Sequence, residues 1–318
     1  MKLALAGDTM LGRGVAEALA RRPPESLIAP EVVAAAREAD LVVLNLECAI
    51  SERGSPWLDP RKPFFFRAPP AAVDVLTHLG VSCVTLANNH ALDFGADALL
   101  DTLDHLAAAG IASVGAGADE ERARDPVVLE AGGLRLAVVG VTDHPGDYAA
   151  GPGRPGVAFA DLGRGGVPDW LTHTVRGHRG DALLVTPHWG PNMVAEPVLH
   201  VQAAASAFVE AGATLVAGHS AHIFQGVQGC VLFDLGGFLD DYATDPVLRN
   251  DLGLLFLVTL DREGPIVLEA VPLKLDFCHT RLADRDDAAW IERRFRRACG
   301  ALGTEVRKED GRLVVAWR

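Results

Sequence analysis

Short apolar runs alternate with amphipathic, alanine-rich stretches through the first two thirds of the chain. The apolar runs predict strands and the amphipathic stretches predict helices, which together indicate an α/β protein with a largely parallel sheet. Glycines at the helix ends fit left-handed C-caps. The predicted strands are 2–7, 39–46, 81–87, 111–115, 134–142, 181–189 and 213–218; the predicted helices are 30–39, 71–80, 96–110 and 198–212.

The pattern changes after Gly218, where longer apolar runs are separated by Glu-Gly and Asp-Gly turns. These runs predict hairpins and a second, mixed or antiparallel sheet built by the second half of the chain. A charged surface helix is expected near the end, and its RRFRR run (293–297) favours a solvated face over an anion site. We expect one domain over 1–318, in which 276–318 is a C-terminal helix and hairpin extension.

Composition narrows the class of protein. The 318 residues are 49% hydrophobic and 22% charged, with a formal net charge of −13, which argues against nucleic-acid or anionic-membrane binding. Five scattered cysteines without a C-x-x-C pair indicate small buried residues in a reducing compartment. The apolar start ends at Gly7-Asp8, too early for a membrane span, so we expect a cytoplasmic protein without a membrane anchor.

Polar side chains follow five of the predicted strands. Each alone is typical of a helix cap, a turn or a structural histidine. Because a sheet gathers the carboxyl ends of its parallel strands, we expect them to converge in one cleft. Carboxylates, amides and imidazoles together suit Mn²⁺, Fe²⁺ or Zn²⁺. The residues are Asp8, Asn45, Glu47, Asn88, Asn89, His90, His188, Trp189, His219 and His222.

Seven segments in this order resemble the calcineurin-like metallophosphoesterase superfamily, and more closely its CapA/PgsA branch of capsule or poly-γ-glutamate synthesis proteins. The resemblance implies a four-layer α/β/β/α sandwich of metallophosphoesterase type, with two mixed sheets flanked by helices and metals at the strand ends. The segments are GDTML (7–11), NLE (45–47), KPFFFRAPP (62–70), LANNHALDFG (86–95), HWGPNM (188–193), GHSAHIFQGV (218–227) and LFDLGGFLDDY (232–242).

The same resemblance implies roles for individual residues. Asp8 and Glu47 are bridging metal ligands, and His90 contacts phosphate and protonates the leaving group. Further metal ligands are Asn89, His188, His219 and His222.

Three positions depart from the family pattern. Met10 stands where a ligand histidine is expected, the last motif is His-x-x-His rather than His-x-His, and Gly237 replaces an aspartate. We therefore expect one tight divalent-metal site, with a second site weak or empty.

Neighbouring residues are candidates for binding an anionic small-molecule or peptide substrate: Arg67, Asn45, Asn88 and Trp189. Arg67 is equally compatible with a surface ion pair. Core packing is favoured for Trp189 over a place in the pocket. Asn88 is expected to hold its turn, and Asp93 to cap the helix that follows. Residues 240–242 fit a pocket rim or a surface turn, and the Gly/Pro-rich stretch 146–168 fits a loop over the active site.

Three functions fit these residues. The first is a metal-dependent phosphoesterase-like hydrolase. The second is a capsule or poly-γ-glutamate synthesis or processing factor. The third is a peptide epimerase that uses Asp8 and His90 for metal-independent proton transfer.

Overall fold

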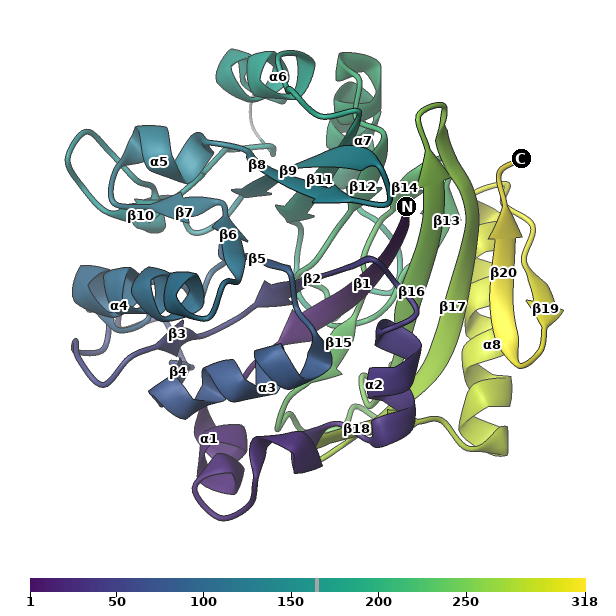
Figure 1. The fold of residues 1–318 in the computed structure, drawn as a ribbon, viewed down its shortest axis with the longest axis horizontal. Helices are drawn as coiled ribbons and strands as arrows, with labels where there is room; N and C mark the ends of the chain where they lie inside the picture. Colours follow the sequence, from purple (N-terminus) through teal and green to yellow (C-terminus); the bar gives the residue numbers. More distant parts are fainter. Residues whose placement is uncertain (164–165) are drawn as a thin grey trace.

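Two large mixed sheets lie face to face, and helices cover their outer faces (Figure 1). The computed structural model describes residues 1–163 and 166–318. The seven strands and four helices predicted for the first two thirds of the chain are present, and Gly80 and Gly212 end their helices in the left-handed conformation. This arrangement confirms the predicted α/β sandwich with two mixed sheets flanked by helices.

The first sheet has the order β19-β20-β17-β16-β1-β2-β5-β6, with β15 paired to β1 and β18 to β17. Pairing is parallel among β1, β2, β5 and β6, and antiparallel from β16 outward. Its strands are β1 (Lys2–Thr9), β2 (Leu41–Leu46), β5 (Cys83–Thr85), β6 (Ala112–Val114), β15 (Gly237–Leu239), β16 (Leu252–Asp261), β17 (Gly264–Asp276), β18 (His279–Leu282), β19 (Arg307–Glu309) and β20 (Arg312–Ala316).

The second sheet has the order β13-β14-β12-β11-β9-β8, and its central strands are parallel. Its strands are β8 (Val127–Ala131), β9 (Leu134–Thr142), β11 (Ala182–His188), β12 (Leu215–Ala217), β13 (Val227–Gln228) and β14 (Val231–Leu232). Two short pairs stand apart from both sheets: β3 (Ala49–Ile50) with β4 (Arg67–Ala68), and β7 (Ala116–Gly117) with β10 (Gly156–Val157).

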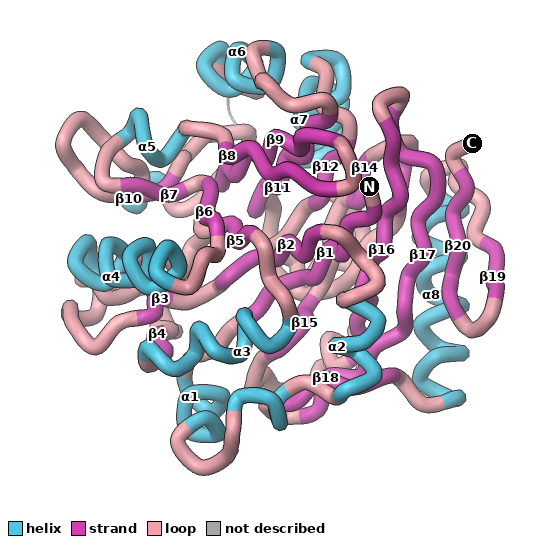
Figure 2. Tube along the Cα trace, in the orientation of Figure 1, coloured by secondary structure: helices cyan, strands magenta, loops and turns pink. Residues whose placement is uncertain are grey.

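The expectation that the second half of the chain builds a second sheet is wrong. The hairpin β16-β17 pairs with β1 and widens the first sheet, whereas the second sheet comes from residues 127–232 (Figure 2). Turn chemistry specifies that two strands form a hairpin, but the sheet edge that a hairpin joins depends on tertiary packing.

The helices form the outer layers. Helices α2, α3 and α4 pack on the first sheet through one apolar cluster, and α6 and α7 pack on the second sheet through another. Helix α8 closes the gap between the sheets at one side, where its buried face joins the inter-sheet cluster. The helices are α1 (Arg13–Leu19), α2 (Pro30–Ala36), α3 (Val73–Leu79), α4 (Gly95–Ala108), α5 (Glu120–Arg124), α6 (Asp169–Arg176), α7 (Leu199–Ala211) and α8 (Arg285–Ala301), with 3-10 turns η1 (Pro24–Leu27), η2 (Pro70–Ala72) and η3 (Gly146–Tyr148).

The stretch 146–168 includes residues 164 and 165, which lie outside the described residues, so the predicted loop is seen only in part. The described part contains η3 and β10, and Tyr148 is buried in the apolar cluster that also holds α3 and α4. Among the described residues, no helix combines the length and the hydropathy needed to span a bilayer.

Candidate metal centre

The carboxylates of the centre come from the ends of β1 and β2. Along β2, Val43 faces the second sheet, and strict alternation carries Asn45 to the same face. Along β1, Leu5 faces the second sheet and Ala6 faces the helices, so unbroken alternation would point Asp8 at the helices. The β1-β2 register instead shifts at Gly7, a bulge that pairs Asp8 with Asn45.

Gly7 is required at this bulge because another segment crosses it closely. A Cβ atom at Gly7 would lie 1.8 Å from the carbonyl oxygen of Gly236, which accepts a hydrogen bond from the Asp8 amide at 2.8 Å. The segment leading into β15 therefore holds the bulge, and the bulge aims the Asp8 side chain between the sheets.

A chain of amides fixes the two carboxylates. Asn88 donates to the Leu46 carbonyl at 2.8 Å and accepts from the His90 amide at 3.0 Å, which defines its orientation. Its amide also donates to Asn45 Oδ1 at 2.9 Å. The Asn45 nitrogen must then face the carboxylates, and it donates to Asp8 Oδ1 at 2.8 Å and Glu47 Oε1 at 3.1 Å. Asn88 holds its turn as predicted, and the amides of Asn45 and Asn88 are fully buried and engaged.

Two imidazoles reach the same carboxylate oxygens from the second sheet. His188 ends β11 and its Nε2 lies 3.0 Å from Glu47 Oε1; its Nδ1 lies 3.4 Å from the Thr142 hydroxyl. His219 follows β12, bridges to His188 through the backbone, and places Nδ1 3.3 Å from Asp8 Oδ1. Its Nε2 contacts the Thr186 hydroxyl at 3.1 Å.

A third imidazole approaches the other oxygens of the two carboxylates. His222 Nδ1 lies 2.9 Å from Asp8 Oδ2 and 3.9 Å from Glu47 Oε2. The loop that presents it has positive φ at Ser220 (111°) and His222 (57°), a conformation that non-glycine residues adopt at a cost. Asp234 holds this loop by accepting the Ala221 amide at 2.8 Å.

Burial and mutual charge set the protonation of these groups. Burial raises the pKa of Asp8, but the adjacent His219 and His222 outweigh it and hold that pKa well below its usual range. Burial and the Asp8 charge raise the pKa of Glu47 well above its usual range. Burial lowers the pKa of His222, but the Glu47 and Asp8 charges bring it to about 10. Burial lowers the pKa of His188 well below its usual range. The negative charge gathered at this centre thus contributes to the raised pKa of both Glu47 and His222.

Among the described residues, several buried ligand atoms of this centre make no hydrogen bond of good geometry. Glu47 Oε2 is one of them. The others, Asp8 Oδ2 and the Nδ1 atoms of His219 and His222, are in ion-pair contact only, with His222 Nδ1 2.9 Å from Asp8 Oδ2. Ligand atoms of Asp8, Glu47 and His222 lie within 4.8 Å of one another. Buried acceptors without partners are costly, and a divalent cation is the group that an O,O,N set of this kind accommodates. The residues present fit a metal.

His90 is held by a separate carboxylate, that of Asp93, and its backbone amide donates to Asn88. Every other group that contacts the Asp93 carboxylate is a donor, so His90 Nδ1 donates to Oδ2 at 2.7 Å and Nε2 is the free ring nitrogen. The donors are the Phe66 amide, the Tyr148 hydroxyl and the Lys62 ammonium. Burial outweighs the Asp93 charge and lowers the pKa of His90 to about 4.

Asp93 does not cap the following helix, which corrects the sequence prediction. Helix α4 begins at Gly95 with Phe94 as its N-cap and no side-chain cap. Tertiary contacts with His90, Phe66 and Tyr148 occupy both oxygens of Asp93.

Three further residues were predicted for the site, and their contacts differ. Asn89 is half-buried, and its Oδ1 is buried without a partner, which suits the ligand role predicted for it. Arg67 instead donates to the Arg53 carbonyl at 3.1 Å and stacks on Phe94. Trp189 lies in the core outside the centre, where its indole donates to the Phe233 carbonyl. The structure therefore does not bring Arg67 or Trp189 into the centre.

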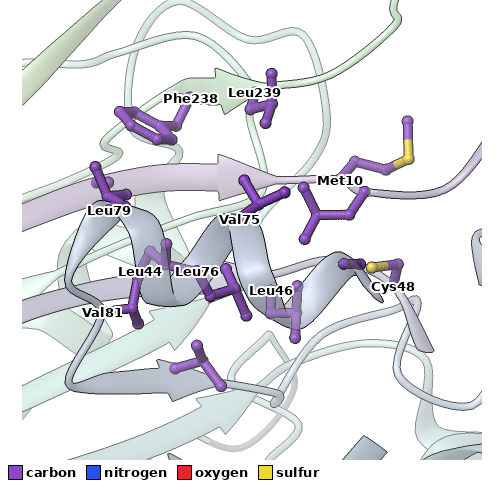
Figure 3. Packing of buried hydrophobic residues seen from close by; sticks show 14 of the residues in the cluster. Met10, Leu44, Leu46, Cys48, Val75, Leu76, Leu79, Val81, Phe238 and Leu239 are labelled. Atoms are coloured by element: carbon purple, nitrogen blue, oxygen red, sulfur yellow. The ribbon is translucent and has the colours of Figure 1, made fainter. Parts of the chain in front are cut away.

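Met10 is part of the apolar core rather than of the centre. It is fully buried in the cluster between the first sheet and its helices, near Val75 and Leu239 (Figure 3). Its sulfur accepts the Gly12 amide at 3.0 Å. A thioether in this position offers a hard divalent ion no good ligand.

A further histidine–aspartate pair, Asp143 and His144, was not predicted from the sequence and lies next to His188. Asp143 and His144 follow β9, and the His144 ring lies 4.9 Å from that of His188. Asp143 contacts His144 Nδ1 and accepts the Gly190 amide at 3.0 Å. The strand-end rule applied to β9 would have found this pair.

Aromatic side chains flank His90 and His222. The sequence pointed to residues 240–242 as a pocket rim or surface turn, but not to Phe66. The rings of Phe66 and His90 are stacked, with their centroids 4.0 Å apart. The rings of Tyr242 and His222 are edge to face, with their centroids 5.2 Å apart. Arg13 lies over both Phe66 and Tyr242 and pairs with Asp241. Both cations near these side chains are paired with carboxylates, Arg13 with Asp241 and Lys62 with Asp93.

The sequence of this chain matches a known protein family. The model of bacterial capsule synthesis protein PGA_cap matches residues 2–242, and the chain belongs to this family. The resemblance to the CapA/PgsA branch is thereby confirmed.

Particular relatives carry related descriptions. A probable polyglutamine synthesis accessory protein from Mycobacterium tuberculosis is 33% identical over 84% of this chain and 74% of its own length. The capsule biosynthesis protein CapA of Bacillus anthracis is 27% identical over 86% of this chain and 67% of its own. The PGA biosynthesis protein CapA of Bacillus subtilis is 28% identical over 74% of this chain and 62% of its own.

A solved structure shares the fold. The crystal structure of a hypothetical protein from Thermus thermophilus superposes with a TM-score of 0.50 at 16% identity, over 87% of this chain and 100% of that one. At this identity the likeness concerns the fold alone.

Proposed function

We propose that this protein is a divalent-metal-dependent hydrolase of anionic substrates, with phosphoesters as the first class to test. One observation carries the proposal: Asp8, Glu47 and His222 gather buried ligand atoms within 4.8 Å of one another, and these atoms meet as ion pairs rather than in hydrogen bonds of good geometry. Mn²⁺, Fe²⁺ or Zn²⁺ would be held by these three residues, with His188, His219 and Asn89 adjacent.

The residues around the carboxylates would each position a different ligand of the metal. A bound divalent metal would supply the polarisation of a substrate oxygen. Asn45 holds Asp8 and Glu47 at a fixed separation through its two N–H groups. Thr142 and Thr186 contact the outer nitrogens of His188 and His219, as groups that orient ligand imidazoles do.

His90 would act as the general acid that protonates the leaving group. Its Nε2 is free while Asp93 binds Nδ1, and the ring is neutral at pH 7 because burial lowers its pKa to about 4. An anionic group beside Nε2 would raise that pKa, and the ring could then donate a proton to the leaving group.

The test is a panel of phosphomonoesters and phosphodiesters with chelator-stripped protein, before and after addition of Mn²⁺, Fe²⁺ or Zn²⁺, with metal content measured in parallel. We expect turnover only with metal, and loss of both metal and turnover in Glu47→Gln. Glu210→Gln on the surface of α7 is the matched control and should behave as the wild type. Turnover that survives stripping, or metal binding that survives Glu47→Gln, would contradict the proposal.

A second candidate function uses the same centre on a glutamyl polymer. The names of the relatives from Mycobacterium and Bacillus, which refer to polyglutamine, capsule and PGA synthesis, support it. The assay is incubation with a γ-linked glutamate oligomer in deuterated water, followed by mass spectrometry. Chain shortening would favour processing by hydrolysis. Deuterium at Cα in chains of unchanged length would favour the epimerase that uses Asp8 and His90.

A further inference from the structure

Helix α8 carries four arginines in the run 293–297. Neither the fold nor the family match explains them. The matched region ends at residue 242, so this helix lies beyond it. Arg296 is engaged by Glu292 and by the Val306 carbonyl. The other three arginines of the 293–297 run line a separate cavity, which we call the arginine pocket: Arg293, Arg294 and Arg297.

The positive charge of the arginine pocket is not balanced by the protein. Among residues 1–163 and 166–318, Arg293, Arg294 and Arg297 have no carboxylate within 4.0 Å, although the chain has 42 acidic residues. Nearby Arg249, in contrast, pairs with Asp251 and Asp287. Like charges three and four residues apart on a helix are destabilising, so helix formation gives no reason for this arrangement.

Arg294 provides the most specific observation. Its guanidinium lies over the rings of Phe224 and Trp290, 5.3 and 5.5 Å from their centroids. Nη1 donates to the Leu248 carbonyl at 3.4 Å, whereas Nη2 is buried and has no acceptor. Burial and the Arg297 charge lower the pKa of Arg294 to about 10. A buried guanidinium N–H group without an acceptor is costly, so neither packing nor hydrogen bonding among the described residues explains this side chain.

Two cavities share Arg294 and Arg297 and have room for a ligand. One has a volume of about 410 Å³ and is lined by the three arginines, Trp290 and Val247, with no acidic residue. The other has a volume of about 310 Å³, and its wall includes Glu196, Gln202 and apolar carbons of Ala298 and Leu302. Ligand pockets of small molecules have such volumes. The first cavity suits charged oxygens, and the second suits the rest of an organic molecule.

We propose that the arginine pocket binds an organic anion that carries two or more carboxylate or phosphate groups. Planar guanidinium groups bind both kinds of oxyanion through paired hydrogen bonds. The site is separate from the candidate metal centre, and it does not depend on the proposed hydrolase function. The sequence favoured a solvated face for RRFRR, but the structure places Arg294 against two aromatic rings.

The test is calorimetric titration of the chelator-stripped full-length protein, in which the metal centre is empty of metal, with a linear pentaglutamate and with pyrophosphate, at low and at physiological salt. We expect saturable one-to-one binding of at least one probe, and the tighter probe identifies the charged group. The double variant Arg293→Gln/Arg297→Gln should weaken binding roughly tenfold or more, because both side chains are exposed and their loss leaves the core intact.

The matched control removes the same two charges elsewhere. Arg176→Gln/Arg179→Gln alters exposed arginines at the end of α6 and just beyond it, and its affinity should stay within about twofold of wild type. Glu47→Gln should also bind normally, which separates this site from the metal centre. The proposal is overturned if neither probe binds saturably at millimolar concentration, or if the control pair weakens binding as much as the pocket pair.

Discussion

Asn45 provides the sharpest test of the centre, because the structure fixes the orientation of its amide. Both N–H groups face carboxylate oxygens, at 2.8 Å from Asp8 and 3.1 Å from Glu47. Asn45→Asp keeps the shape but replaces these donors with acceptors and gathers three buried carboxylates. Hydrogen bonds to charged groups contribute about 1.5–3 kcal/mol each. Removing both should lower the free energy of unfolding by about 4 kcal/mol in the presence of a chelator.

Metal should reverse this loss, because a third carboxylate is an additional ligand for a divalent ion. Wild-type protein should gain about 2.7 kcal/mol at a Mn²⁺ concentration one hundred times its Kd. Asn45→Asp should gain at least about 1.4 kcal/mol more than wild type at the same concentration, since tenfold tighter binding is worth that much. The assay is urea unfolding followed by circular dichroism, with chelator and with Mn²⁺.

Asn250→Asp is the matched control. Asn250 is also buried, but its amide donates to the Ala243 carbonyl at 3.1 Å and its oxygen accepts from the Asp245 amide. This variant should lose stability that Mn²⁺ does not restore. If Asn45→Asp is as stable as wild type in chelator, the Asn45 amide does not donate to the two carboxylates, and the inferred orientation of its side chain is wrong.

Three further predictions concern the same centre. His90→Asn should keep its metal content but lose roughly 10²–10⁴-fold in turnover of any substrate found; loss of metal would make His90 a ligand. Met10→His should lower the unfolding free energy by about 2–4 kcal/mol, because an imidazole enters an apolar cluster; a second tight metal site formed at unchanged stability would refute this. The His222–Asp8 contact should stabilise the metal-free protein fully below about pH 6.5, the unfolded pKa of histidine, and lose its effect as pH rises to about 10, the folded pKa. Wild type and His222→Gln, unfolded in urea across this range with chelator, should therefore converge; a constant difference would contradict the raised pKa.

The sequence predicted the carboxylates and imidazoles because strand ends have a general geometric meaning. Parallel strands deliver their carboxyl ends to one edge of a sheet, which groups Asp8 with Glu47 and His188 with His219. The two pairs meet because the two sheets lie face to face, which strand-end geometry alone does not specify. Asp143 and His144 follow the same rule at the end of β9, where no polar pair was predicted.

Other features depend on contacts that no local pattern contains. The sequence rule for helix starts assigned Asp93 to a cap, but the Phe66 amide and the Tyr148 hydroxyl bind its oxygens from distant segments. The donor role of Asn45 depends on Asn88, which is 43 residues away. Arg67 lies within the segment 62–70, yet its guanidinium packs on Phe94 rather than in the centre.

The two halves of the centre belong to different layers of the sandwich. The carboxylates extend from β1 and β2 and the imidazoles from the ends of β11 and β12, with the inter-sheet apolar cluster as the spacer between the layers. The thickness of that spacer sets the distance between oxygen and nitrogen ligands. A change of volume at Val43 or Leu184, both within the spacer, should therefore retune metal affinity. Related sequences that alter one side of this spacer are expected to compensate on the other.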